Sequence, residues 1–136
     1  MWGLSFFLPA ILFQMAKNPE TLLKDKVLWD LKNLPNTYAR KIQQVVIRGT
    51  PDILACINGH FVALELKRSP KESPDPLQTY EIRQIEKAGG QAYVVNPENW
   101  PRVLDALTIL ARAESLPKPH HGHTENPTGV RLAPVG

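Results

Sequence analysis

The apolar residues near the start of this chain recur at helical spacing, with polar residues between them. They are Leu23, Val27, Leu31 and Leu34. Positions three and four apart share one face of a helix, so this face is predicted to be buried. Asn18 and Pro19 fit the start of the helix, because asparagine caps free amide groups and proline suits the first turn. Pro35 is predicted to end it.

Three extended segments follow this helix. Residues 38–47 are rich in strand-forming residues, and the QQVVI portion has the strongest strand character. Residues 52–57 and 60–67 are predicted as two further strands, joined by Asn58 and Gly59. Asn-Gly is the strongest short signal for a hairpin with a two-residue type I′ turn.

This hairpin is predicted to bring charged side chains together. The two-residue loop pairs Ile57 with His60, and the same register carried outward places Asp52 opposite Glu65. Directly opposed residues share a face, with Cβ atoms about 4.5–5.5 Å apart. Lys67, two residues after Glu65, points to that face as well. Two acids and a lysine are therefore expected at one end of a mostly apolar hairpin.

The second half of the chain alternates between helix and strand. A proline-rich loop ends at Asp75, which is predicted to cap a helix that stops at Gly89 and Gly90. Residues 91–95, QAYVV, are predicted to form a strand, and residues 101–113 a last helix. Its inward residues are Val103, Leu104, Leu107 and Leu110. The order helix, three strands, helix, strand, helix predicts an α/β domain with a mixed sheet flanked by helices.

The two ends of the chain differ from this domain, which is predicted to span residues 16–114. Residues 1–15 are apolar, too short to span a bilayer, and lack the basic start of a signal peptide. We expect them to lie upstream of a true start near Met15; a membrane-binding or partner-binding segment is the less favoured alternative. Residues 115–136 are rich in Pro, His and Gly and are predicted to be a disordered tail. Its histidines could hold a transition metal, although a solvated tract is favoured.

Composition allows a single domain. A chain of 136 residues with 43% hydrophobic and 21% charged residues is long enough for one core. A net charge of +3 is compatible with a polyanionic partner, but many proteins without one share it. The only cysteine, Cys56, excludes an internal disulfide framework and fits a reducing compartment. No Ser/His/Asp or Cys/His arrangement and no glycine-rich phosphate loop suggests a competing chemistry.

The paired carboxylates of Asp52 and Glu65 favour a metal site. Two adjacent carboxylates repel, and one tends to keep a proton because its neighbour raises its pKa. A divalent cation removes this conflict, and oxygen ligands select Mg²⁺, Mn²⁺ or Ca²⁺. The alternative is a salt-bridge cluster in which Lys67 neutralises one acid. Apolar surroundings make such a cluster costly, so the metal site is favoured.

The sequence GTPD at residues 49–52, followed after a hairpin by ELK at residues 65–67, resembles the PD-(D/E)xK nuclease signature. NPE at the first helix, PLQTY at the second and GGQAYVV at the following strand extend the likeness. Together they resemble the VRR-NUC (virus-type replication-repair nuclease) branch of that superfamily, which is similar to Holliday-junction resolvases. The resemblance covers roughly residues 19–110 and implies a restriction-endonuclease-like core.

The resemblance implies roles for four residues of the hairpin. Asp52 and Glu65 would ligate the metal, Mg²⁺ or in its place Mn²⁺, and the backbone carbonyl of Leu66 would be a further ligand. Lys67 would orient or help deprotonate the attacking water and offset charge on the phosphate. These roles match phosphodiester hydrolysis, in which a bound cation activates water and stabilises the developing charge.

Two helical residues complete the implied site. Glu20 would reach the metal directly or through water; the equally favoured alternative is a first-turn acid stabilised by the helix dipole. Gln78 would support Lys67 or the nucleophilic water. Its alternative role is a capping box with Asp75, and the two roles are compatible.

The implied function is a Mg²⁺-dependent endonuclease that is selective for branched DNA in repair, recombination or phage replication. A homodimer with two sites, no membrane partner, and a cytoplasmic location in a bacterial cell or a phage-encoded origin are implied with it. Basic residues near the site are candidate phosphate contacts, with a solvated basic surface as the equal alternative. They are Arg48, Arg68, Lys71, Arg83 and Lys87. A restriction-type or nonspecific nuclease, and a non-catalytic DNA-binding module with the nuclease fold, remain as alternatives.

Overall fold

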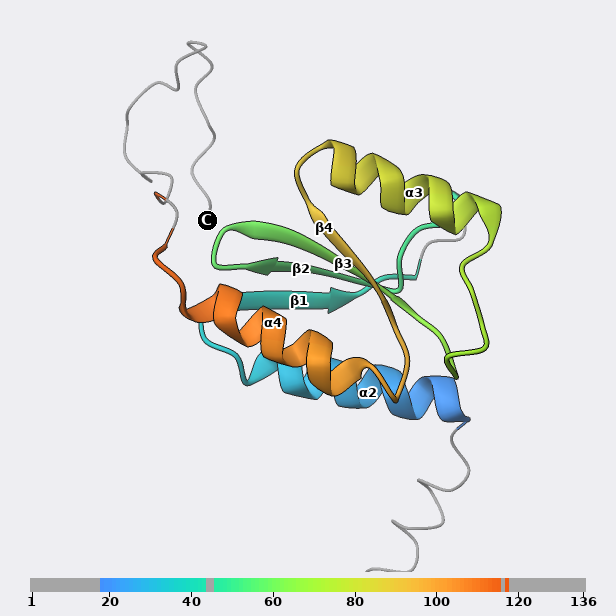
Figure 1. Ribbon diagram of the computed structural model, residues 1–136, viewed down its shortest axis with the longest axis horizontal. Coiled ribbons are helices and arrows are strands. Elements are labelled where there is room, and N and C mark those ends of the chain that lie inside the picture. Colours follow the sequence, from blue (N-terminus) through green and yellow to red (C-terminus); the bar gives the residue numbers. More distant parts are fainter. Residues whose placement is uncertain (1–17, 44–45, 116, 118–136) are drawn as a thin grey trace, which may run out of the picture.

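The computed structural model describes residues 18–43, 46–115 and 117, which form a four-stranded sheet and three helices (Figure 1). In chain order the elements are α2 (Pro19–Lys32), β1 (Thr37–Lys41), β2 (Ile53–Ile57), β3 (His60–Leu66), α3 (Pro76–Lys87), β4 (Gln91–Val95) and α4 (Trp100–Arg112). The predicted α/β class is confirmed, and the described elements follow one another along the chain as expected. The predicted extension at residues 1–15 and nearly all of the predicted tail lie outside the described residues.

The sheet is mixed, in the order β1-β2-β3-β4. Strand β2 pairs antiparallel with both β1 and β3, whereas β3 and β4 are parallel. Helix α3 connects these two parallel strands, which agrees with the need for a long crossover between them. The carboxyl ends of β3 and β4 therefore lie together at one end of the sheet.

The hairpin between β2 and β3 has the predicted register. Ile57 pairs with His60, and the ladder continues to the pair of Ile53 and Leu64. Asn58 and Gly59 have φ angles of 50° and 86°, and a type I′ turn requires positive φ at both central positions. The ladder ends one pair short of Asp52 and Glu65, because Asp52 lies in a bend before β2.

The predicted strand at residues 38–47 is only partly correct. Its first part matches β1, but Val46 and Ile47 lie in a bend and are 88% and 56% exposed. Strand-forming residues need a neighbouring strand and a surface to pack on. The ladder ends where Lys41 pairs with Ile53, the first residue of β2, and Ile42 N donates one hydrogen bond beyond it to the Asp52 carbonyl.

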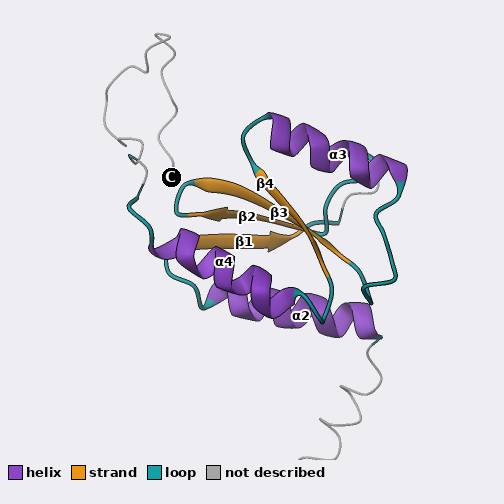
Figure 2. Cartoon of the chain, in the orientation of Figure 1, coloured by secondary structure: helices purple, strands orange, loops and turns teal. Residues whose placement is uncertain are grey.

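The two faces of the sheet are covered unequally (Figure 2). Helices α2 and α4 lie on one face and α3 on the other. The α2 and α4 face is the apolar core, and the indole Nε1 of Trp100 donates to Asp30 Oδ2 across the two helices at 2.8 Å. Its fully buried side chains include Val27, Leu31, Ile53, Leu64 and Leu107. Helix α3 has no fully buried residue.

Asn58 links the hairpin turn to the last helix. Its side-chain Nδ2 donates to the carbonyl oxygens of Leu110 and Ala113 at 3.1 and 3.0 Å, where α4 ends. Carbonyl groups at a helix end lack some of their partners within the helix, and this buried asparagine supplies donors to them. The Leu110 carbonyl also accepts from the backbone N–H of Ala113 at 3.4 Å. No helix within the described ranges is long and apolar enough to cross a membrane.

Candidate active site

Asp52 joins the beginning of β2 to the end of β3. Its Oδ2 accepts a hydrogen bond from the backbone N–H of Leu66 at 2.8 Å, while its own carbonyl accepts from Ile42 N at 2.8 Å. The acid is therefore held between the strands on both sides. Its second oxygen, Oδ1, does not take part in these two contacts.

Glu65 is buried, with 4% of its surface exposed, although it carries an ionisable group. Its Oε1 accepts a hydrogen bond from Gln78 Nε2 at 2.7 Å, whereas the buried Oε2 has no hydrogen-bond partner among the described residues. Burial, and then the negative charge of Asp52, raise the pKa of Glu65 to about 8, against the opposing effect of Lys67. An ionised Glu65 would leave this buried oxygen without a donor, which is costly. A hydrogen bond with the Asp52 side chain is a further cause of the raised pKa, so the two acids share a proton that a bound cation would replace.

Gln78 connects Glu65 to Lys67. Its Oε1 accepts from Lys67 Nζ at 2.8 Å and from the backbone N–H of Asp75 at 2.9 Å, while its Nε2 faces Glu65. Its own backbone N–H donates to Asp75 Oδ1 at 2.9 Å, which completes a capping box. The structure thus gives Gln78 both the capping contact and a contact with Lys67. Lys67 Nζ also lies 3.7 Å from Glu65 Oε1.

Gly49 allows the first turn of α3 to approach this site. It has a φ angle of +87°, and a Cβ atom there would lie 2.7 Å from the carbonyl carbon and oxygen of Leu77. Because these are backbone atoms of the residue before Gln78, the glycine of the GTPD sequence sets the distance between that turn and the helix. A side chain at this position would push the helix away.

Glu20 forms an ion pair with the basic residue that follows Lys67. Its Oε2 lies 3.7 Å from Arg68 Nε, and its side chain is partly exposed. Within the described ranges no three His, Cys, Asp or Glu residues are grouped closely enough to hold a metal ion. The structure therefore brings together Asp52, Glu65, Lys67 and Gln78, and leaves Glu20 in an ion pair at the border.

Lys24 is a site residue that the sequence analysis missed. Its Nζ lies 4.0 Å from Asp52 Oδ1, and both side chains are about one-fifth exposed. The available signal was its position four residues after Glu20, since residues at that spacing share a helix face.

The candidate phosphate contacts are all on the surface. Arg48, Arg68, Lys71, Arg83 and Lys87 are exposed. Arg68 directly follows Lys67 and borders the site through Glu20. Lys87 is nine residues beyond Gln78 on α3, which corresponds to about 14 Å along the helix axis. The structure therefore associates Arg68 with the carboxylates more closely than it does Lys87.

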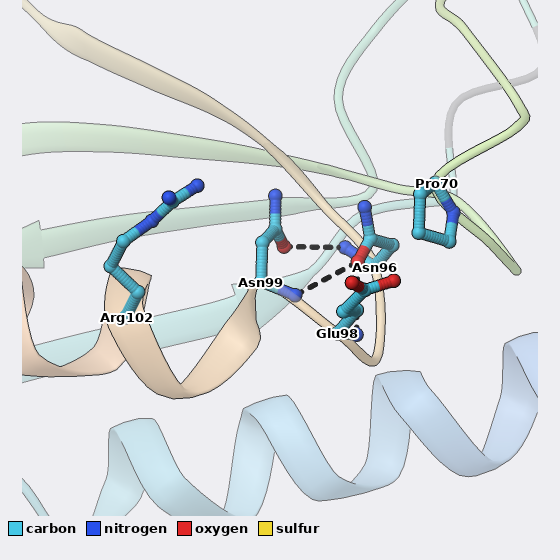
Figure 3. Close-up of a pocket in the computed structure, with 5 residues that line it drawn as sticks. All are labelled: Pro70, Asn96, Glu98, Asn99 and Arg102. Carbon is cyan, nitrogen blue, oxygen red and sulfur yellow. Dashed lines mark hydrogen bonds between the residues drawn. The ribbon is translucent and has the colours of Figure 1, made fainter.

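A separate hollow of about 350 Å³ lies beside the turn before α4 (Figure 3). It is lined by Pro70, Asn96, Glu98, Asn99 and Arg102. Asn96 and Asn99 are committed to the turn, because the side-chain oxygen of each accepts from the backbone N–H of the other at 2.8–2.9 Å. With Glu98 as the one acid in its lining, this hollow does not offer the paired carboxylates found at Asp52 and Glu65.

Comparisons of this chain with models of known protein families, with curated proteins and with solved structures found no match.

Proposed function

We propose that this chain is a metal-dependent endonuclease of the PD-(D/E)xK type, similar to the VRR-NUC branch. The observation that carries the proposal is the bridge made by Gln78 between Glu65 and Lys67. It joins two residues of the proposed signature beside a buried carboxylate oxygen that has no partner among the described residues. The mixed sheet, in which the hairpin supplies both acids, supports a restriction-endonuclease-like core.

The oxygen atoms at the site fit a divalent cation. Glu65 Oε2 has no hydrogen bond within the described part of the chain, and the ammonium of Lys24 lies 4.0 Å from Asp52 Oδ1. Hard oxygen donors suit Mg²⁺ or Mn²⁺, and the Leu66 carbonyl is the third proposed ligand. A bound cation would remove the repulsion between the two acids, activate the attacking water and stabilise charge on the phosphate.

The remaining residues hold the reacting groups in position. Lys67 is anchored by Gln78, so its ammonium stays beside the carboxylates, where it would orient water and offset charge on the phosphodiester. Gln78 is fixed by the capping box, which leaves its amide one favourable orientation. Glu20 would act through water or by positioning Arg68. The preference for branched DNA and the homodimer are taken from the family resemblance.

The test is cleavage of a labelled four-way junction and a matched linear duplex, with Mg²⁺ or with EDTA. We expect Mg²⁺-dependent cutting of the junction, and a loss of at least about a hundredfold in Lys67→Ala. Lys26→Ala is the control on α2, because Lys26 is exposed and pairs with Asp30 away from the carboxylates.

Each other outcome changes the proposal. Equal cutting of both substrates would support the proposed nuclease activity but contradict the proposed preference for junctions. It would favour a restriction-type or nonspecific enzyme. If the wild type binds DNA but does not cut it in Mg²⁺ or Mn²⁺, the proposed function would change from a nuclease to a non-catalytic DNA-binding module. Full activity in Lys67→Ala would remove the proposed site.

A further inference from the structure

Two lysines flank the carboxylate pair, and they are held differently. Lys67 lies beside Glu65 and is anchored by a 2.8 Å hydrogen bond to Gln78. Lys24 reaches the pair from α2, on the side of Asp52, through an ion pair of 4.0 Å. A contact at this limiting distance holds a long, flexible side chain weakly. Lys67 is therefore fixed, whereas Lys24 is able to change partner.

The contact made by Lys24 involves Asp52 Oδ1, the oxygen that does not accept the hydrogen bond from Leu66. Oδ2 already accepts from the backbone N–H of Leu66, so Oδ1 has more lone-pair capacity for a metal ligand bond. Lys24 approaches this same Oδ1. A divalent cation at that position would repel the ammonium across a short distance. Lys24 and the cation cannot both keep Oδ1 as their main partner.

The charges around the site indicate where Lys24 would go. When a divalent cation is bound and both acids are ionised, the charges of the two acids and the two lysines cancel. The two positive charges of the cation are then uncompensated. A DNA phosphodiester brings a negative charge that is fixed in the DNA backbone. The Nζ of Lys24 has enough stem to follow an anion at the mouth of the site, since lysine has four methylene groups and three donors.

We propose that Lys24 is a phosphate-binding residue that rests on Asp52 in the free protein and transfers to a DNA phosphate oxygen when the cation binds. This inference rests on the proposed nuclease function. It makes DNA and metal binding cooperative, because Lys24 opposes the cation in the absence of DNA and supports the DNA in its presence. By linkage, the metal must strengthen DNA binding by the same factor as DNA strengthens metal binding.

The test measures both affinities in Lys24→Met, which keeps the length of the side chain and removes its charge. Without DNA, we expect Mn²⁺ to bind at least about fivefold more tightly than to the wild type, by isothermal titration calorimetry. With Ca²⁺ in place of Mg²⁺, we expect junction and linear DNA to bind more weakly. The slope of log affinity against log salt should fall in magnitude by about 1, as for one lost phosphate contact.

Two further variants separate this role from a structural one. Lys24→Arg keeps a cation and should retain the salt slope of the wild type. Lys26→Ala lies on the same helix and should leave both affinities unchanged. Circular dichroism checks the fold of each variant. If Lys24→Met is unstable, Lys24→Arg provides the comparison, and Lys24→Arg must then match the wild type in its affinities for Mn²⁺ and for DNA.

The outcomes distinguish this inference from the proposed function. Unchanged or weaker Mn²⁺ binding by Lys24→Met, with a wild type that binds Mn²⁺ and cuts DNA, would overturn the role of Lys24 alone. An unchanged salt slope would overturn it as well. Absence of Mn²⁺ binding by the wild type would overturn both proposals.

Discussion

The two faces of the sheet are built on different principles. On one face, α2 and α4 bury apolar side chains such as Val27 and Leu107 completely. On the other, α3 has no fully buried residue and leaves Leu77 and Tyr80 substantially exposed. Yet this second face carries the buried Glu65 and its bridge through Gln78. Polar contacts specify the position of α3, while apolar burial stabilises α2 and α4.

This difference indicates where the molecule can accommodate a site. Burial of an ionisable carboxyl group such as Glu65 lowers stability, and the face with the larger apolar core compensates for that loss. The face that carries the site can then be arranged by capping, close backbone approach and hydrogen bonds. Four substitutions test this division, each against a matched substitution or condition.

The largest expected effect is a loss of stability in the apolar core. Leu107→Ala on α4 removes a fully buried side chain and should destabilise the protein by about 2–5 kcal/mol. Leu77→Ala on α3, where the side chain is 46% exposed, should cost less than about 1 kcal/mol. Urea unfolding followed by circular dichroism measures both. Similar losses for the two substitutions would contradict the difference between the faces.

The next largest expected effect is a gain in stability on substitution of Glu65, and it depends on pH. The pKa of Glu65 is raised from 4.5 to about 8, so the folded protein retains a proton that the unfolded chain releases between these values. Without metal, this group should lower the free energy of unfolding by up to about 1.4 kcal/mol per pH unit as pH rises through that window. Below pH 4.5 the loss is absent, because both states are protonated.

Glu65→Gln removes this titration. In EDTA the variant should therefore gain stability relative to the wild type between about pH 5 and pH 7.5, by up to about 3 kcal/mol. Thermal or urea unfolding at several pH values measures the difference. Mg²⁺ should stabilise the wild type and have less effect on the variant. A difference that does not change with pH would show that burial of Glu65 is compensated in another way.

A smaller loss is expected at the contact between the GTPD turn and α3. Gly49→Ala introduces a Cβ into a left-handed conformation and against the Leu77 backbone. The conformation alone costs roughly 1–2 kcal/mol. Gly89 has a similar φ angle of +90°, but a Cβ there would meet no atom within 4 Å, so Gly89→Ala carries the conformational cost only. Gly49→Ala should therefore lose more stability than Gly89→Ala in urea unfolding and also lower the proposed cleavage.

The smallest expected effect distinguishes the capping of a helix from the positioning of Gln78 at the site. Asp75 and Asn18 each accept a hydrogen bond from a backbone N–H in the first turn of a helix, at 2.9 and 2.8 Å. Replacing either with alanine should cost about 1 kcal/mol. Only Asp75→Ala should reduce the proposed cleavage, because its partner is Gln78. Equal cleavage by the two variants would mean that Gln78 does not need its cap.

Much of this fold could be predicted because its signals are local. Asn58 and Gly59 determine the hairpin turn, and the turn determines the register between β2 and β3. Asn18 and Asp75 mark helix starts through contacts with residues three positions away. The strand predicted at Val46 and Ile47 was wrong because strand propensity cannot indicate where the neighbouring strand begins.

The candidate site was predictable where it follows from the hairpin register, and not where it depends on helix placement. The proximity of Asp52, Glu65 and Lys67 follows from adjacent strands. Glu20 was expected to reach the metal directly or through water, which stays a prediction; the packing of α2 pairs its side chain with Arg68. The same packing brings Lys24 to Asp52, a contact between residues of separate elements.

The sequence by itself determined the elements, their caps, the hairpin register and the pair of acids, because each depends on neighbours along the chain or across one short turn. Only the tertiary structure decided that Gln78 bridges Glu65 and Lys67, that Glu65 is buried with an oxygen unpaired among the described residues, and that Lys24 faces Asp52. These contacts arise when α2 and α3 pack against the end of the sheet. Their distances depend on the volumes of all the side chains between those elements, which no local pattern of residues specifies.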